Sequence, residues 1–134
     1  MSNFEVGQEL APVSYPIDRA LLVAYAKASG DQNPIHQNEE FAKSVGLPDV
    51  IAHGMLTMAL AGRFVSEVAG GPAKVKEFFA RFIKPIVVPG DTTVHLIVSG
   101  KISAIENGTA KIDIQATCAD VKVLGMAKAV ISLS

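Results

Sequence analysis

A long apolar segment near the middle of the chain, from Ala52 to about Ala69, most constrains the fold. Apolar and small residues occupy nearly every side of the helix that it would form, so we expect a helix buried all round. Arg63 interrupts the segment, which is too short to cross a bilayer. Gly70-Gly71-Pro72 should end it. The rest of the chain must therefore wrap around this helix.

The residues after this helix alternate between apolar and polar side chains, as strands of an antiparallel sheet do. We expect strands over 75–88, 93–99, 111–118 and 127–133, with the second and third joined at the hairpin signal Glu106-Asn107-Gly108. A sheet that follows one apolar helix must curve around it. The pattern therefore predicts an α+β fold, a single hot-dog domain over residues 1–134.

The first third of the chain carries helix signals instead. Asp18 should cap a helix over 19–29 that Gly30 ends, after a short strand that finishes at Ile17. Asn38 should cap a shorter helix over 39–45. Pro34 biases its neighbour away from helical angles, so we expect residues 31–36 to form a loop.

The composition of the chain limits the classes of partner that it can bind. The 134 residues are 49% hydrophobic and 19% charged, and the net charge of −1 with no basic block argues against nucleic acid or an anionic membrane as partner. A mean hydropathy of +0.34 indicates more apolar surface than one small domain can bury, hence an oligomer. Cys118 is the one cysteine, so no internal disulfide forms. Residues 1–16 contain no apolar run typical of a signal peptide, and we expect a cytoplasmic protein.

The loop at residues 29–36, Ser-Gly-Asp-Gln-Asn-Pro-Ile-His, brings a carboxylate and an imidazole close together. Asp31 and His36 can both move protons near neutral pH, which suits the elimination or addition of water beside a carbonyl. In an arbitrary sequence, such a spacing more often reflects an Asp that caps a turn and a His that packs at a surface.

Gly54 follows His53 at the start of the apolar helix. Backbone N–H groups at a helix start are unpaired, and a Gly lets a ligand oxygen approach them, so Gly54 is a candidate oxyanion donor. The alternative is that Gly54 only permits close packing of the helix. We interpret His53 as a helix cap or packing residue. The absence of His-x3-His and Cys-x2-Cys spacings predicts that no metal is bound.

Three motifs resemble those of one family, the MaoC-like or hydratase-2-type hot-dog enzymes. Residues 29–36 resemble its Ser-Gly-Asp-x-Asn-Pro-hydrophobic-His signature without a gap, and His53-Gly54-Met55 resembles the His-Gly-Met before its central helix. Residues 81–91 resemble its Arg-Phe-x-x-Pro-hydrophobic-x-Pro-Gly-Asp motif with one residue more. Within the family, the chain looks most like the catalytic subunit of (3R)-hydroxyacyl-thioester dehydratases.

The resemblance implies a hydro-lyase of fatty-acid metabolism that interconverts (3R)-3-hydroxyacyl and trans-2-enoyl thioesters. Asp31 and His36 would be the catalytic pair, Gly54 the backbone donor to the thioester oxygen, and Asn33 a support for the loop. No separate cofactor is implied, because coenzyme A or acyl carrier protein is part of the substrate. The partner would be an identical or related hot-dog chain.

Two other functions fit the same fold. A hot-dog thioesterase would need a carboxylate on the central helix, where Glu67 alone is available. A non-catalytic acyl-binding partner subunit would have no use for the set of Asp31, Asn33 and His36.

Overall fold

The computed structural model of the chain describes residues 4–134, so residues 1–3 of the predicted domain lie outside it. The helices and strands are, in chain order, β1 (Glu9–Ile17), α1 (Arg19–Ser29), the 3-10 turn η1 (Pro34–His36), α2 (Glu39–Ser44), α3 (Gly54–Ala69), the 3-10 turn η2 (Pro72–Lys74), β2 (Val75–Phe82), β3 (Val94–Glu106), β4 (Thr109–Cys118) and β5 (Val121–Ser132). The predicted α+β class is confirmed.

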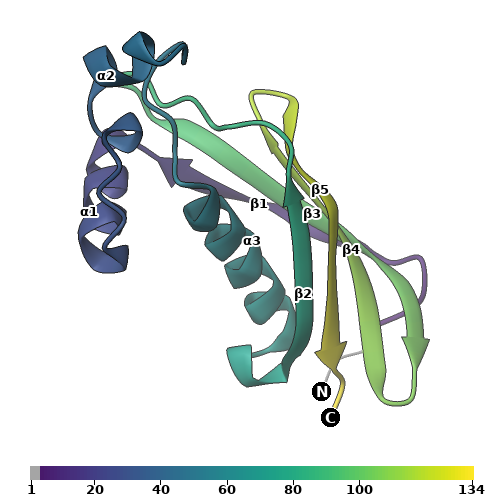
Figure 1. Cartoon of the computed structure of the whole chain (residues 1–134). Coiled ribbons are helices and arrows are strands. Elements are labelled where there is room, and N and C mark those ends of the chain that lie inside the picture. The colour runs from purple at the N-terminus through teal and green to yellow at the C-terminus, as the bar shows by residue number, and fades with distance from the viewer. Residues whose placement is uncertain (1–3) are drawn as a thin grey trace.

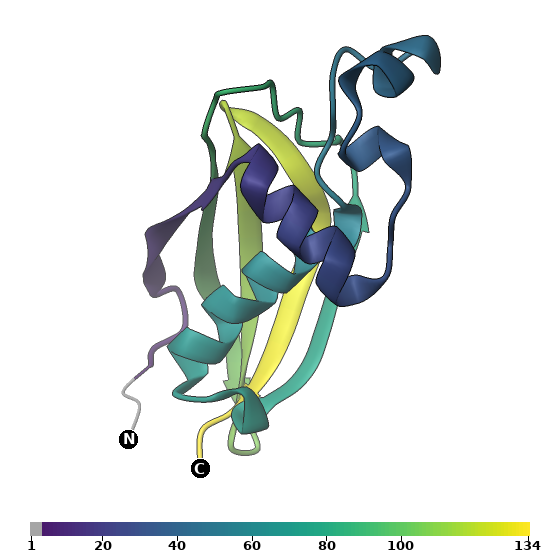
Figure 2. The same ribbon diagram turned by 90° about the vertical axis from the view of Figure 1, so that its left-hand side faces the viewer.

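The five strands form one antiparallel sheet in the order β1-β3-β4-β5-β2. The sheet curves around α3, and α1 lies on the same side (Figure 1). Figure 2 shows α3 crossing the concave face of the sheet. This is the hot-dog arrangement that the pattern predicts. Among residues 4–134, no helix is long and apolar enough to cross a membrane.

Two glycines set the close approach of α3 to the edge strand β2. A Cβ added at Gly54 would lie 3.3 Å from the ring of Phe82, and one added at Gly62 would lie 3.4 Å from the ring of Phe78. The two aromatic side chains therefore cover the helix at two levels, and a methyl group at either glycine would be in close contact with the ring above it. The start of α3 is thus fixed under Phe82.

The long helix differs from its prediction in two ways. It begins at Gly54 instead of Ala52, because the Ala52 N–H donates to the carbonyl of Ile86 in a strand-like contact. It is also not buried all round: Met55, whose side chain is 57% exposed, and Arg63 both lie on a solvent-facing side. This side carries the charged Arg63 and Glu67, and Met55 at its start is apolar surface that a single copy of the fold does not cover.

The strand expected over 75–88 ends at Phe82 instead. Pro85 has no N–H to donate to a sheet, and the chain leaves β5 to meet the segment before α3. There Val88 donates to the carbonyl of Val50, and Ile51 forms an isolated bridge with Val87. On its other side, the Ile51 N–H donates to the carbonyl of Ile35. Residues 50–52 therefore link the 86–88 segment to η1.

The loop predicted over residues 31–36 contains the 3-10 turn η1, whereas the predictions for α1 and for the hairpin are confirmed at their capping and turn residues. The Asp18 side chain accepts the Leu21 N–H at 2.8 Å, and Gly30 ends α1 in the left-handed conformation. Asn107 and Gly108 both have positive φ, as the hairpin turn between β3 and β4 requires. β3 and β5 are longer than predicted, and β1 begins at Glu9.

Arg19 ties the first helix to the segment that precedes α3. Its guanidinium donates to the carbonyl of Val88 at 2.6 Å and to the Asp49 carboxylate at 2.7 Å, and it also pairs with Glu39 at 3.3 Å. Charge-assisted bonds of this kind are short and directional. Through Arg19, α1 and α2 are held against the backbone that carries the candidate site.

Candidate active site

Asp31 lies in the loop between α1 and η1, and its side chain is exposed. Its carboxylate accepts the Asn33 N–H at 3.2 Å, and its own N–H donates to the Ser29 hydroxyl. The Asn33 side chain accepts the Ile35 N–H and so caps η1. The Asn33 carbonyl also accepts the His36 N–H at 3.1 Å, so Asn33 shapes the loop through three bonds. Its support of a catalytic pair stays a prediction.

His36 ends the same loop but is buried, with 7% of its surface exposed. Its ring Nδ1 lies 2.7 Å from the carbonyl oxygen of Ile51. A carbonyl oxygen can only accept, so Nδ1 carries the proton in this bond. In the neutral ring, Nε2 is then the bare nitrogen, which is the form that a general base needs.

His53 sits at the N-cap of α3, where its carbonyl accepts the N–H groups of Leu56 and Thr57 and its side chain makes no capping bond. Its ring is 1% exposed, and it stacks on the His36 ring with centroids 3.8 Å apart. Its Nε2 lies 3.1 Å from the carbonyl oxygen of Asp31. Burial lowers the pKa of His53 below its usual value, and the bond to Asp31 opposes this shift.

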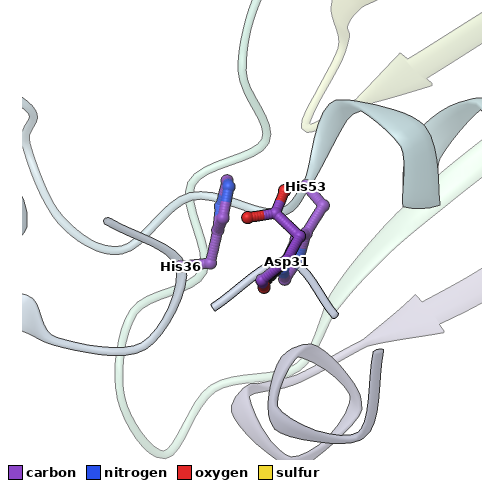
Figure 3. Close-up of side chains that lie close together, drawn as sticks. All are labelled: Asp31, His36 and His53. Atoms are coloured by element: carbon purple, nitrogen blue, oxygen red, sulfur yellow. Dashed lines mark hydrogen bonds between the residues drawn. The ribbon is translucent and has the colours of Figure 1, made fainter. Parts of the chain in front are cut away.

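The fold brings these three side chains together, as Figure 3 shows, with the Asp31 carboxylate directed toward the His36 ring. One carboxylate oxygen of Asp31 and one ring nitrogen of each histidine lie within 4.8 Å of one another. By distance alone such a group could hold a metal ion, which the linear spacing did not indicate. However, one nitrogen of each histidine is already hydrogen-bonded to a backbone carbonyl. The other nitrogen of His53 has less than 1 Å² of its surface exposed. The metal-free site stays a prediction.

Gly54 supplies the first N–H of α3, and within residues 4–134 this N–H has no hydrogen-bond acceptor. It borders a pocket of about 290 Å³ that reaches the ring of His36. The remaining lining is mostly apolar and consists of Ile51, Ala52, Thr57, Phe82, Ile83, Lys84, Pro85, Ile86 and Val123. An imidazole, an unpaired N–H at a positive helix end and an apolar cavity therefore share one space.

Glu67, the carboxylate considered for a thioesterase, lies at the other end of α3, about 20 Å from Gly54 at the usual helical rise. It accepts the Tyr15 hydroxyl at 3.2 Å and pairs with Arg63 at 3.8 Å. Burial and this bond to Glu67 raise the pKa of Tyr15 to about 12. Glu67 thus serves a local polar cluster with Tyr15 and Arg63.

Sequence reasoning found Asp31, His36 and Gly54 but assigned no contact with the pair to His53. The sequence signal for His53 was its position one residue before Gly54, which begins α3 and lines the candidate pocket. The sequence does not reveal that the same ring reaches back to the loop, because 22 residues separate His53 from Asp31.

The comparisons with known proteins point to one family. The family model described as "MaoC like domain" matches residues 3–119. Among curated relatives, 3-hydroxyacyl-thioester dehydratase Y of Mycobacterium tuberculosis is 44% identical over 83 residues, which are 60% of this chain and 27% of the relative. The peroxisomal enoyl-CoA hydratase 2 of Arabidopsis thaliana is 39% identical over 70 residues, which are 51% of this chain and 22% of the relative. The chain thus spans about a quarter of the length of these relatives.

Solved structures extend the likeness to the whole fold. A MaoC-like dehydratase superposes with a TM-score of 0.95 at 37% identity, over 98% of this chain and 41% of that one. The ChsH1-ChsH2 complex of Mycobacterium tuberculosis has a TM-score of 0.84 at 21% identity, over 97% of this chain and 98% of that one, a likeness of fold alone. With a family match over residues 3–119 and a hot-dog sheet around α3, this chain belongs to the MaoC-like domain family.

Proposed function

We propose that this chain is a hydro-lyase that interconverts (3R)-3-hydroxyacyl and trans-2-enoyl thioesters of coenzyme A or acyl carrier protein in fatty-acid metabolism. One observation carries the proposal: His36, which lies within 4.8 Å of Asp31, lines one pocket with Gly54, whose helix-start N–H has no acceptor within residues 4–134. The names of the similar dehydratase and hydratase support the same reaction.

The separation of the pair suits one bound water. A water that hydrogen-bonds two groups at ordinary lengths and a near-tetrahedral angle holds them about 4.5 Å apart. The Asp31 oxygen and the His36 nitrogen lie within 4.8 Å of each other. The same water can therefore touch both side chains and still present a lone pair to a bound substrate.

The bond to Ile51 favours one direction of proton transfer. Because Nδ1 of His36 already donates to this carbonyl, Nε2 is free to accept a proton from the water. In hydration, the water oxygen adds to C3, its proton passes to His36, and the resulting imidazolium gives that proton to C2. Asp31 stays ionised, orients the water and stabilises the imidazolium. Dehydration reverses each step.

The developing negative charge on the thioester oxygen needs its own partner. The Gly54 N–H is unpaired and carries the positive end of the α3 dipole, so it can bind this oxygen as the charge grows. The apolar pocket wall would hold the acyl chain. No step needs a cofactor beyond the carrier part of the substrate, and a cytoplasmic location stays a prediction.

The test is to mix the purified protein with trans-2-enoyl-CoA substrates of four and eight carbons. We expect the enoyl-thioester absorbance to fall, with a (3R)-3-hydroxyacyl product and no free thiol. Thiol release as the primary event would support the thioesterase instead. Binding of both substrates without any turnover would support the acyl-binding subunit and contradict our proposal.

We also propose that a second hot-dog chain, identical or related, covers the edge of the sheet beside the pocket. Among the strands of residues 4–134, β2 has a partner on one side alone. Two of its side chains, Phe79 and Phe82, and the following Ile83 are each about half exposed. Exposed aromatic residues on an unpaired edge strand are typical of an interface. The Met55 side chain, also exposed, extends this surface onto α3.

At micromolar concentration, light scattering coupled to size exclusion should give twice the 14.1 kDa mass of one chain. Phe79→Lys should shift the population toward the monomer, because it places a charge at the covered edge. Val23→Lys, on the exposed side of α1, is the matched control and should leave the mass unchanged. A wild-type monomer under these conditions would rule out pairing between identical chains.

A further inference from the structure

We propose that His53 is a positioning residue that holds Asp31 and His36 in register and stays uncharged while they exchange protons. The proposal rests on the proposed function, because it concerns the same acid–base pair. It gives a role to a buried imidazole that the proton transfer itself does not use.

The contact with Asp31 is a cross-link between two parts of the chain. The Asp31 side chain is exposed, and its carboxylate has one protein partner within the described residues, the Asn33 N–H. The loop that carries it is otherwise joined to the start of α3 by the bond from His53 Nε2 to the Asp31 carbonyl. Because His53 immediately precedes Gly54, this bond ties the Asp31 backbone to the helix start that carries the oxyanion donor.

The contact with His36 fixes the plane of the second ring. The two imidazoles are stacked, 23° from parallel, and the Tyr25 ring packs edge-on against His53 with centroids 4.8 Å apart. His36 is also bonded at Nδ1 to Ile51. With one face and one nitrogen held, the His36 ring has a fixed orientation, and one of its nitrogens stays within 4.8 Å of an Asp31 carboxylate oxygen.

The hydrogen bonds also determine the charge of His53. Nε2 must carry a proton to donate to the Asp31 carbonyl, and Nδ1 is buried with no partner. A second proton on Nδ1 would be an N–H without an acceptor, which is costly in the interior. The titratable groups that face the ring are Asp31 from the loop, His36 from η1 and Tyr25 from α1, and a charged His53 would place a cation against His36 whenever His36 accepts a proton.

The first experiment separates the effect of the hydrogen bond from His53 to Asp31 from the effect of the ring stacked on His36. His53→Phe keeps an aromatic face against His36 but has no donor, whereas His53→Gln keeps an N–H donor near the Asp31 carbonyl. We expect His53→Phe to lower kcat about 10- to 100-fold, as small displacements of reacting groups do, with KM nearly unchanged. His53→Gln should recover most of the loss and keep the wild-type acid limb of the pH–rate profile.

His95→Gln is the matched control. His95 is exposed on β3, bonds to the Ser14 hydroxyl and makes no bond to a residue of the site. The variant should behave as wild type. Wild-type kcat in His53→Phe, or an equal loss in the Phe and Gln variants, would overturn the positioning role of the bond. An acid limb displaced in His53→Gln would mean that His53 is charged in the wild type.

The second experiment needs no turnover. Nitrogen-15 NMR of the imidazole rings should show His53 as the neutral Nε2–H tautomer over about pH 5.5 to 8, the range in which an ordinary histidine titrates. A His53 ring that gains a proton in that range, or that carries its proton on Nδ1, would contradict the proposal. If the wild type hydrates no enoyl thioester, the proposed function fails while this measurement still decides the tautomer and charge of His53.

Discussion

Asp31→Asn and His36→Asn are each expected to lower kcat for enoyl-thioester hydration by roughly 10²–10⁴-fold, the range for loss of a general acid–base group. Asp31→Asn removes the negative charge that orients the water and stabilises the imidazolium, with almost no change of shape. His36→Asn keeps a side-chain N–H near the position of Nδ1, so the bond to Ile51 can persist while the base is lost.

Steady-state kinetics with the two variants and their combination checks this expectation. Because the two groups act on one water, the double variant should be little worse than either single variant. Asp113→Asn, an exposed carboxylate on β4, is the matched control and should keep wild-type turnover. The pair would have no catalytic role if both single variants turned over at nearly the wild-type rate.

Gly54→Pro should lower kcat by roughly 10²–10³-fold relative to Gly54→Ala, the usual effect of deleting one oxyanion donor. Gly54 is the first residue of α3, where proline is well tolerated because the N–H of that position has no partner in the helix. The preceding His53 is already extended, with φ −60° and ψ 133°, which a following proline accepts. The substitution to proline therefore removes the N–H of residue 54 and keeps the start of α3 intact.

The alanine variant is the necessary reference, because both substitutions add a Cβ near Phe82. That Cβ would lie 3.3 Å from the ring, and the half-exposed Phe82 side chain can move outward by the few tenths of an ångström required. Circular dichroism and thermal unfolding should show both variants folded. Equal kcat values for the proline and alanine variants would exclude the Gly54 N–H as the donor to the thioester oxygen.

The sequence predicted the elements that local chemistry determines. α1 begins and ends as expected because Asp18 caps it and Gly30 adopts the left-handed conformation that ends it. The hairpin at Asn107 and Gly108 follows from the same kind of local preference. Both the pairing of Asp31 with His36 and the place of Gly54 at a helix start could also be predicted, because each lies within a short stretch of chain.

The errors arose where distant segments compete for the same backbone groups. Ala52 looks helical by composition, but its N–H bonds to Ile86 instead, and this shortens both the helix and the strand that was expected to continue to Val88. The role of His53 was missed for a similar reason, since its partners lie in a loop that is remote in the sequence. Hydrophobic periodicity indicates which face of an element is apolar, but it does not indicate which remote carbonyl will accept the hydrogen bond of a given N–H.

The double linkage of residues 50–52 also bears on where the chain tolerates changes in length. Successive backbone groups of this stretch face opposite neighbours, with Val50 and Ala52 bonded to the 86–88 segment and Ile51 bonded to η1. An inserted or deleted residue here would exchange the two sides, so the carbonyl that holds His36 would face away from it. The hairpin tip at Asn107 and Gly108 has one remote bond, from the Leu133 N–H to the Gly108 carbonyl, and this bond involves no residue of the site. That tip, and not the approach to α3, is therefore where evolution can lengthen the chain or an added label can be carried.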